Sequence, residues 1–193
     1  MSDYIPRLNA NGMMNNPFWY SNNTFYNMVT TPPHLYGLPN CTCYCLGRWL
    51  ELFDYYGATE YPRTSINNAY EWYTYNDGYE RGQTPKLGAI ACWKNKTKVE
   101  GRHLGYPGHV AIVEELFLGG GYKTSNSNWG LNHDGDYFVT YNVDSNNYFG
   151  DNDLVFQGFI YNPYVDKGRI IHSNFIHYIN KRKFMKRRGC IWR

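Results

Sequence analysis

The sequence lacks the segments that would place the protein in a membrane or direct its export. No apolar run approaches the ~20 residues needed to span a bilayer. The first residues, MSDYIPRLNANGMMNNPFWY, show no basic start followed by an apolar stretch, which is the pattern of a secretory signal. Charged residues make up only 18% of the chain, below the roughly one quarter usual in globular proteins. We therefore expect no membrane association and no export signal in this chain.

The five cysteines match neither a disulfide framework nor a metal site. Cys41, Cys43 and Cys45 are too close to pair readily with one another, and Cys92 and Cys190 stand alone. No Cys-x-x-Cys pair or closely spaced His pair completes a zinc site. On a helix, side chains two positions apart point nearly opposite ways, so Cys43 cannot share a site with the other two. We therefore predict no metal and no cofactor.

Length and composition are those of one globular domain. The 193 residues, 42% of them hydrophobic, suffice for a single core. The formal net charge is +3, and residues 180–193, NKRKFMKRRGCIWR, hold seven Lys and Arg and no acid. Such a run contacts nucleic acid, an anionic polymer or an acidic partner in some proteins and is a solvated end in others. Both interpretations stay open.

The order of predicted elements indicates an α+β fold. The Asn-, Pro-, Tyr- and Phe-rich start has no sustained periodicity and predicts an irregular arm. Leu46, Trp49, Leu50 and Phe53 recur at helical spacing before Gly57, which predicts a helix over roughly 41–56. Further segments predict a helix at 65–75 and strands at 86–93, 108–117, 121–129, 136–143 and 153–162. We expect the helices to pack on one side of a curled antiparallel sheet.

Cys41 is the best candidate for a nucleophile. Pro39 stops any earlier helix and Asn40 is a good N-cap, so Cys41 falls in the first turn of the helix. Free backbone N–H groups and the helix dipole there lower the pKa of a thiol and can hold an oxyanion. Cys45, and with it Cys43, is interpreted as a small buried packing residue. A capped helix carrying an inert cysteine is the alternative.

A thiolate needs a base, and the base needs a residue that orients it. His109 opens the strand GHVAIVEEL, at the rim of the predicted sheet, and is the candidate base. In TSNSNWG, Asn126 and Asn128 alternate onto one face of a strand, where either amide oxygen can accept the imidazole N–H. A capping histidine and an exposed polar strand are the alternatives.

The blocks NCTCYCLGR, PKLGAIACW, GYPGHVAIVEE and TSNSNW, in this order, closely resemble the CHAP family of cysteine- and histidine-dependent amidohydrolases and peptidases. The resemblance implies a papain-like α+β fold and divides the chain into an arm (1–35), a catalytic domain (36–165) and a C-terminal extension with the basic tail (166–193). It places the nucleophile at Cys41 and the general base at His109. Many members carry Glu-x-Asn where this chain has Asn126-Ser127-Asn128, so an amide replaces the usual carboxylate.

Other site roles follow from the same resemblance. The oxyanion is expected to contact the N–H of Cys41 and the side-chain amide of Asn40. Trp129 lines the substrate groove or ends a strand in the core. Some members bind calcium through acidic residues before the cysteine, and TTPPHLYGLPN has none, so no calcium is predicted.

The resemblance implies a peptidoglycan hydrolase that cleaves the amide between muramic acid and the peptide stem, or a bond within the stem or cross-bridge. The Asn- and Tyr-rich sequence is phage-like. We therefore expect a virion protein at the tail, which acts on the host wall beside other tail proteins. An enzyme in the host cytoplasm before lysis is the alternative. A catalytically degenerate structural component of the virion is the second hypothesis. Nucleic-acid binding is the weakest, because it rests on residues 181–193 alone.

Overall fold

The computed structural model describes residues 3–27, 29–31, 34, 35, 37–96, 108–128, 135–151 and 153–165, and only the backbone of those among residues 27–35. Its helices are η1 (Pro17–Trp19), α1 (Thr24–Asn27), α2 (Cys41–Tyr55) and α3 (Ala69–Trp72). Its strands are β1 (Val29–Thr31), β2 (His34–Leu35), β3 (Arg81–Gly82), β4 (Ile90–Asn95), β5 (His109–Leu116), β6 (Tyr122–Asn126), β7 (Val139–Val143) and β8 (Leu154–Ile160). None of these helices is long and apolar enough to cross a membrane.

Helix α2 begins and ends where its local sequence signals place it. Asn40 caps it, since its Oδ1 accepts the backbone N–H groups of Thr42 at 2.8 Å and Cys43 at 3.1 Å. At the other end Gly57 takes a φ of +73°, and the N–H of Ala58 donates to the carbonyl of Phe53 at 2.8 Å. The predicted helix is therefore confirmed, with its first residue at Cys41.

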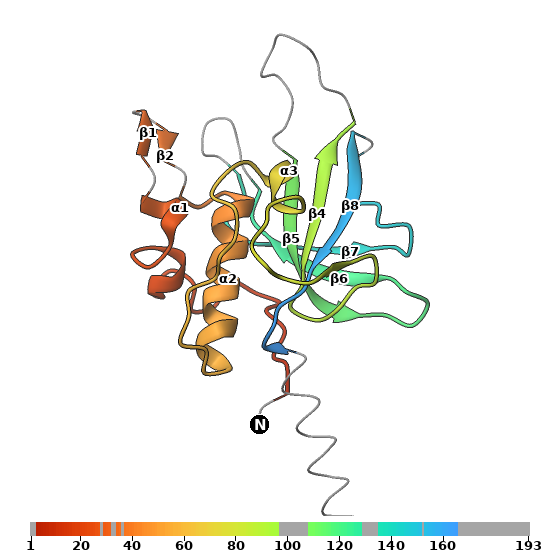
Figure 1. Ribbon diagram of the computed structural model, residues 1–193, viewed down its shortest axis with the longest axis horizontal. Helices are drawn as coiled ribbons and strands as arrows, with labels where there is room; N and C mark the ends of the chain where they lie inside the picture. Colours follow the sequence, from red (N-terminus) through yellow and green to blue (C-terminus); the bar gives the residue numbers. More distant parts are fainter. Residues whose placement is uncertain are drawn as a thin grey trace, which may run out of the picture.

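The main sheet has six antiparallel strands in the order β3-β8-β4-β5-β6-β7. Strands β4 to β7 form a meander, whereas β8 does not continue it but returns to pair with the free side of β4. In Figure 1, α2 lies against one face of this sheet, next to β5. The α+β fold is thus confirmed; the second helix is shorter than predicted, and the short edge strand β3 was not predicted.

The N-terminal arm is more ordered than its sequence predicts. It contains η1, α1, β1 and β2, and its side chains Met13, Trp19 and Phe25 are buried in the same core as α2. Trp19 explains the glycine in the middle of α2, because a Cβ at Gly47 would lie 2.7 Å from the indole ring. The arm therefore belongs to the core that carries the helix.

A buried charge joins the start of the chain to α2 and β5. Glu114 is 1% exposed, and its carboxylate accepts hydrogen bonds from Tyr4 Oη at 2.5 Å, the N–H of Arg7 at 2.9 Å and Ser125 Oγ at 2.7 Å. It also pairs with Arg48 of α2, Nε to Oε1, at 3.1 Å. Every oxygen of this carboxylate is therefore satisfied, as a buried charge requires.

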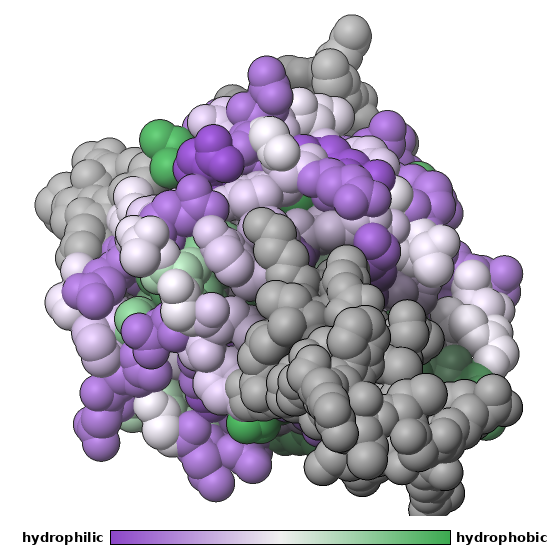
Figure 2. All heavy atoms as spheres, turned by 60° about the horizontal axis from the view of Figure 1, so that its bottom comes forward, coloured by the Kyte–Doolittle hydropathy of each residue, from purple (hydrophilic) through white to green (hydrophobic). Residues whose placement is uncertain are grey.

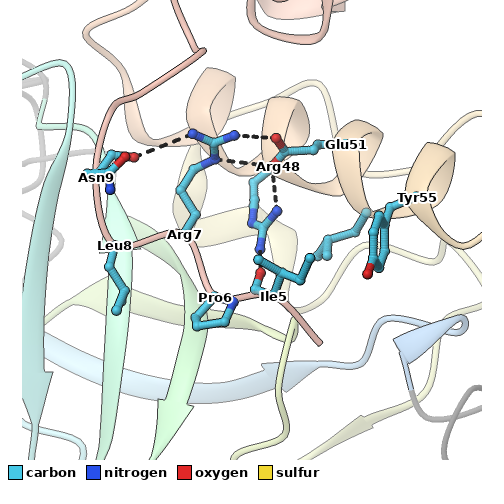
Figure 3. A pocket seen from close by; sticks show the side chains of 9 residues that line it. Ile5, Pro6, Arg7, Leu8, Asn9, Arg48, Glu51 and Tyr55 are labelled. Carbon is cyan, nitrogen blue, oxygen red and sulfur yellow. Dashed lines mark hydrogen bonds and ion pairs between the residues drawn. The ribbon is translucent and has the colours of Figure 1, made fainter. Parts of the chain in front are cut away.

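Arg48 and Arg7 also meet at a second carboxylate. Figure 3 shows both guanidinium groups directed at Glu51, one turn along α2, while Arg48 also donates to the carbonyl of Ile5 at 2.6 Å. A small cleft of about 230 Å³ lies between residues 5–9 and the second half of α2. Elsewhere, the described part of the face in Figure 2 is mostly hydrophilic, with hydrophobic side chains in separate small patches.

Candidate active site

Cys41 lies where the first turn of α2 meets β5. All three cysteines of this helix are buried, and Cys41, with 7% of the residue exposed, is less completely buried than Cys43 and Cys45. The backbone N–H groups of Val110, Thr42 and Cys41 itself lie near enough to the sulfur to favour its thiolate form. Val110 directly follows His109, which brings the predicted nucleophile to the residue beside the predicted base.

The thiol of Cys41 is nevertheless protonated near neutral pH. Burial raises its pKa from 9.0 to about 11, which outweighs the opposite effect of the three N–H groups. The expected lowering of this pKa is therefore wrong for the free protein. The position at the helix start supplies the predicted donors, but the surrounding core removes the water that would solvate a thiolate.

The other cysteines belong to the core, which agrees with their interpretation as packing residues. Burial raises the pKa of Cys43 to about 12 and that of Cys45 well above its usual value. Cys92 is also buried, in the same cluster between α2 and the sheet. In the part of the chain that the structure describes, no three His, Cys, Asp or Glu side chains are grouped to hold a metal ion.

His109 is the first residue of β5 and pairs with Trp93 of β4. Its ring packs on Phe149, with centroids 4.5 Å apart, and lies 6.2 Å from the ring of Trp93. Trp93 belongs to the cluster on the sheet face opposite α2. The imidazole thus lies on that face, while the sulfur of Cys41 reaches β5 at the neighbouring backbone N–H.

Asn126, the last residue of β6, is the predicted orienting residue that the structure brings to His109. It is fully buried and approaches the imidazole closely enough to raise its pKa. Within the described ranges, however, neither its amide oxygen nor its amide nitrogen makes a hydrogen bond of ordinary geometry, and neither does Nε2 of His109. Buried polar atoms left in this state are rare in folded proteins.

Asn128 lies two residues beyond the end of β6, where its N–H donates to the carbonyl of Asp136 at 3.0 Å. It is half-buried, and it does not affect the pKa of His109. Trp129, the predicted groove residue, lies outside the described residues. Of the two asparagines, the geometry therefore favours Asn126.

The imidazole of His109 is neutral at physiological pH. Burial lowers its pKa from 6.5 to about 4, and the smaller effect of Asn126 opposes this. Together with the protonated thiol of Cys41, this makes the resting pair uncharged. Among the described residues, neither of these two groups contributes to the pKa of the other.

Ser127 is a residue of the site that sequence reasoning missed. Its Oγ accepts the N–H of Asn40 at 3.1 Å and donates to the carbonyl of Asp136 at 2.9 Å. This fully buried hydroxyl thereby joins the residue before Cys41 to the residue after Asn126. Its only signal in the sequence is its place between the two candidate asparagines.

Asn40 caps α2 as predicted. Its Oδ1 is occupied by the cap, since it accepts from two backbone N–H groups and from the hydroxyl of Thr42 at 2.6 Å. Among the described residues, the hydrogen bonds of its side chain are those of this cap. The oxyanion role itself stays a prediction.

The chain matches few known proteins, and one family. No curated protein matches its sequence. Among solved structures, an N-acetylmuramoyl-L-alanine amidase from Staphylococcus aureus aligns at 23% identity with a TM-score of 0.39, over 62% of this chain and 30% of that one. So partial a likeness says nothing about what this chain acts on. The CHAP-domain family model matches residues 30–128, just over half of the chain and the part that holds Cys41, His109 and Asn126. The protein therefore belongs to the CHAP-domain family.

Proposed function

We propose that the protein hydrolyses an amide bond of bacterial peptidoglycan with Cys41 as nucleophile and His109 as base. The bond is the one between muramic acid and L-alanine, or one within the stem peptide or cross-bridge. The observation that carries the proposal is the meeting of a helix-start cysteine with β5, at the N–H that follows His109, inside a CHAP domain. The family resemblance supplies the substrate class.

The steps use this chain's own groups. The sulfur of Cys41 attacks the carbonyl carbon while His109 takes the thiol proton. The C–N bond then breaks, His109 returns the proton to the leaving amine, and a thioester forms on Cys41. Water, deprotonated by His109, attacks the thioester and releases the carboxylic acid, and the proton held by His109 returns to the sulfur.

The oxyanion and the base each need support. We assign the oxyanion to the N–H of Cys41 and to Nδ2 of Asn40; loss of one such donor typically costs about 3 kcal/mol of transition-state stabilisation. We assign the orientation of His109 to Asn126, whose amide adds no charge to stabilise an imidazolium. A base that stays neutral until the moment of attack fits the lowered pKa of His109.

The first test compares clearing of purified Gram-positive cell walls by the wild type, Cys41→Ala and Cys43→Ala. We expect Cys41→Ala to abolish clearing and folded Cys43→Ala to retain it, because the second thiol is fully buried packing. Equal clearing by wild type and Cys41→Ala would remove Cys41 from the mechanism. Mass spectrometry of the released fragments identifies the bond, since amidase cleavage frees a stem peptide that begins with L-alanine.

A second candidate function is a degenerate, structural CHAP domain of a phage particle. The amide at the position of the usual carboxylate and the raised pKa of Cys41 favour it. Absence of hydrolysis on every wall type, by a correctly folded protein, would support it over the enzyme.

In either case we place the protein in a phage virion, at the tail and beside other tail proteins, or in the host cytoplasm before lysis. The Asn- and Tyr-rich composition of its N-terminal arm supports this placement. Detection in purified virions by mass spectrometry would separate the two locations. Nucleic-acid binding stays a prediction, and residues 181–193 lie outside the described part of the chain; salt-dependent DNA binding that disappears when they are deleted would support it.

A further inference from the structure

Asn126 approaches the imidazole of His109 closely enough to raise its pKa, but this approach is not a hydrogen bond of ordinary geometry. In the described parts of the chain Nε2 of His109 is buried without a partner, and both amide atoms of Asn126 are in the same state. A catalytic imidazole must keep one orientation, and other catalytic sites achieve this with a carboxylate or amide hydrogen bond. The packing around the ring therefore bears on its orientation as well.

Aromatic packing restricts the imidazole ring. The ring of Phe149 lies over the imidazole, with centroids 4.5 Å apart and an interplanar angle of 33°. The ring centroid of Trp93 lies 6.2 Å from that of the imidazole and 4.6 Å from that of Phe149, so the three rings pack together. On its outer side Phe149 contacts Tyr141 at 5.0 Å. The imidazole is therefore confined between rings from β4 and from the loop after β7.

The loop that carries Phe149 is built to hold it in place. The carboxylate of Asp144 accepts the N–H groups of Asn146 at 2.9 Å and Tyr148 at 3.2 Å, which closes the turn. The carbonyl of Asn147 accepts the indole N–H of Trp93 at 2.9 Å, and its side chain accepts the hydroxyl of Tyr122 at 3.0 Å. The loop is thus fastened to the same tryptophan that faces His109.

We propose that Phe149 is a positioning residue for His109, which it holds by ring packing together with Trp93, in addition to the orientation assigned to Asn126. It keeps the ring plane in one orientation and keeps water from the imidazole. Its catalytic consequence rests on the proposed function, whereas its effect on the ring does not.

The electrostatic surroundings make the effect measurable. Burial lowers the pKa of His109, and among the described residues the only other effect is the smaller, opposite one of Asn126 of β6. No charged side chain from β4, from β6 or from residues 144–150 acts on this pKa within the described part of the chain. Exposure of the ring to water is therefore the change to which the titration responds.

The test is an NMR titration of the His109 ring in the wild type, Phe149→Ala, Phe149→Tyr and Tyr148→Ala. We expect Phe149→Ala to raise the midpoint by ~1–2 pH units towards the ordinary value. Phe149→Tyr, which keeps a flat ring, and Tyr148→Ala, an exposed neighbour in the same loop, should titrate like the wild type. A wild-type midpoint in Phe149→Ala would overturn the proposal.

A second variant tests the proposal if Phe149→Ala does not fold. Phe149→Leu keeps an apolar side chain of similar bulk without a ring face, and we expect its kcat on cell walls to fall about tenfold or more at unchanged KM. Unchanged kcat in Phe149→Leu would equally contradict positioning by ring packing. Absence of hydrolysis by the wild type would refute the proposed function, while the titration would still decide the role of Phe149.

Discussion

At the scale of single residues, the site is defined by two pKa values that burial moves in opposite directions. Removal of water raises the pKa of the Cys41 thiol and lowers that of the His109 imidazole, because in both cases the charged form loses its solvation. The free protein therefore holds a neutral pair rather than a thiolate–imidazolium pair. This state is consistent with proton transfer that accompanies attack on the substrate.

The raised thiol pKa predicts slow alkylation at neutral pH. With a pKa of about 11, the thiolate fraction of Cys41 should grow about tenfold for each pH unit from 7 to 10. We expect the rate of reaction with iodoacetamide, followed by mass spectrometry of the Cys41 peptide, to rise in the same way. Fast alkylation at pH 7 that saturates below pH 8 would show an activated thiol instead.

The lowered imidazole pKa predicts that acid destabilises the fold. The unfolded chain binds a proton at His109 below about pH 6.5, whereas the folded chain binds it only near pH 4. The contribution of His109 to the free energy of unfolding is thus fully present above pH 6.5. As the pH falls to 4, this contribution decreases by on the order of 3 kcal/mol. Urea unfolding at pH 7.0 and 4.5 should show a smaller acid loss in His109→Gln than in the wild type; equal losses would contradict the assignment.

At the scale of elements, the site depends on how the start of α2 is held against the ends of β5 and β6. The cap by Asn40 fixes the first turn, the N–H of Val110 meets the sulfur, and Ser127 ties the backbone of Asn40 to β6. A second connection, from Arg48 to Glu114, holds the middle of α2 against β5. Both connections can be tested separately.

The Ser127 connection should matter more for catalysis than for stability. Ser127→Ala leaves the N–H of Asn40 without its acceptor, which costs about 1–3 kcal/mol of unfolding free energy. Because Cys41 follows directly, we expect kcat on cell walls to drop about tenfold or more, with KM nearly unchanged. Ser145→Ala, in the turn after β7, serves as the control. Unchanged kcat in a folded Ser127→Ala protein would leave the hydroxyl with a purely structural role.

The Arg48–Glu114 connection should dominate stability. Arg48→Met leaves a buried carboxylate without its main counter-charge, and we expect a loss of about 3–5 kcal/mol in urea unfolding. Glu115→Gln, which removes the neighbouring ion pair with Lys123 at the surface, should cost less than about 1 kcal/mol. Similar losses in both variants would show that burial does not distinguish the two pairs.

At the scale of the whole molecule, the arm and the catalytic region share one core. Met13, Trp19 and Phe25 are buried with the residues of α2, and Tyr4 and Arg7 supply donors to Glu114. The predicted boundary near residue 36 therefore separates segments in the sequence that pack together in space.

Truncation tests this arrangement. We expect a fragment of residues 36–193 to melt well below the full chain, or to remain unfolded, because it loses three large buried side chains and two donors to a buried charge. Circular dichroism melting of both proteins measures the difference. Equal melting temperatures would show that residues 36–193 fold without the arm.

The sequence by itself determined those features of this protein that depend on residues close together in the chain. Asn40 and Gly57 bound α2, alternation indicates β4 to β8, and the four motif blocks identify the family and point to Cys41 and His109. What only the tertiary structure decided are the pKa values, the approach of Asn126 rather than Asn128 to His109, and the contact of Phe149 with a histidine 40 positions earlier. The physical reason is that desolvation and ring packing depend on residues from distant elements, which no local pattern encodes.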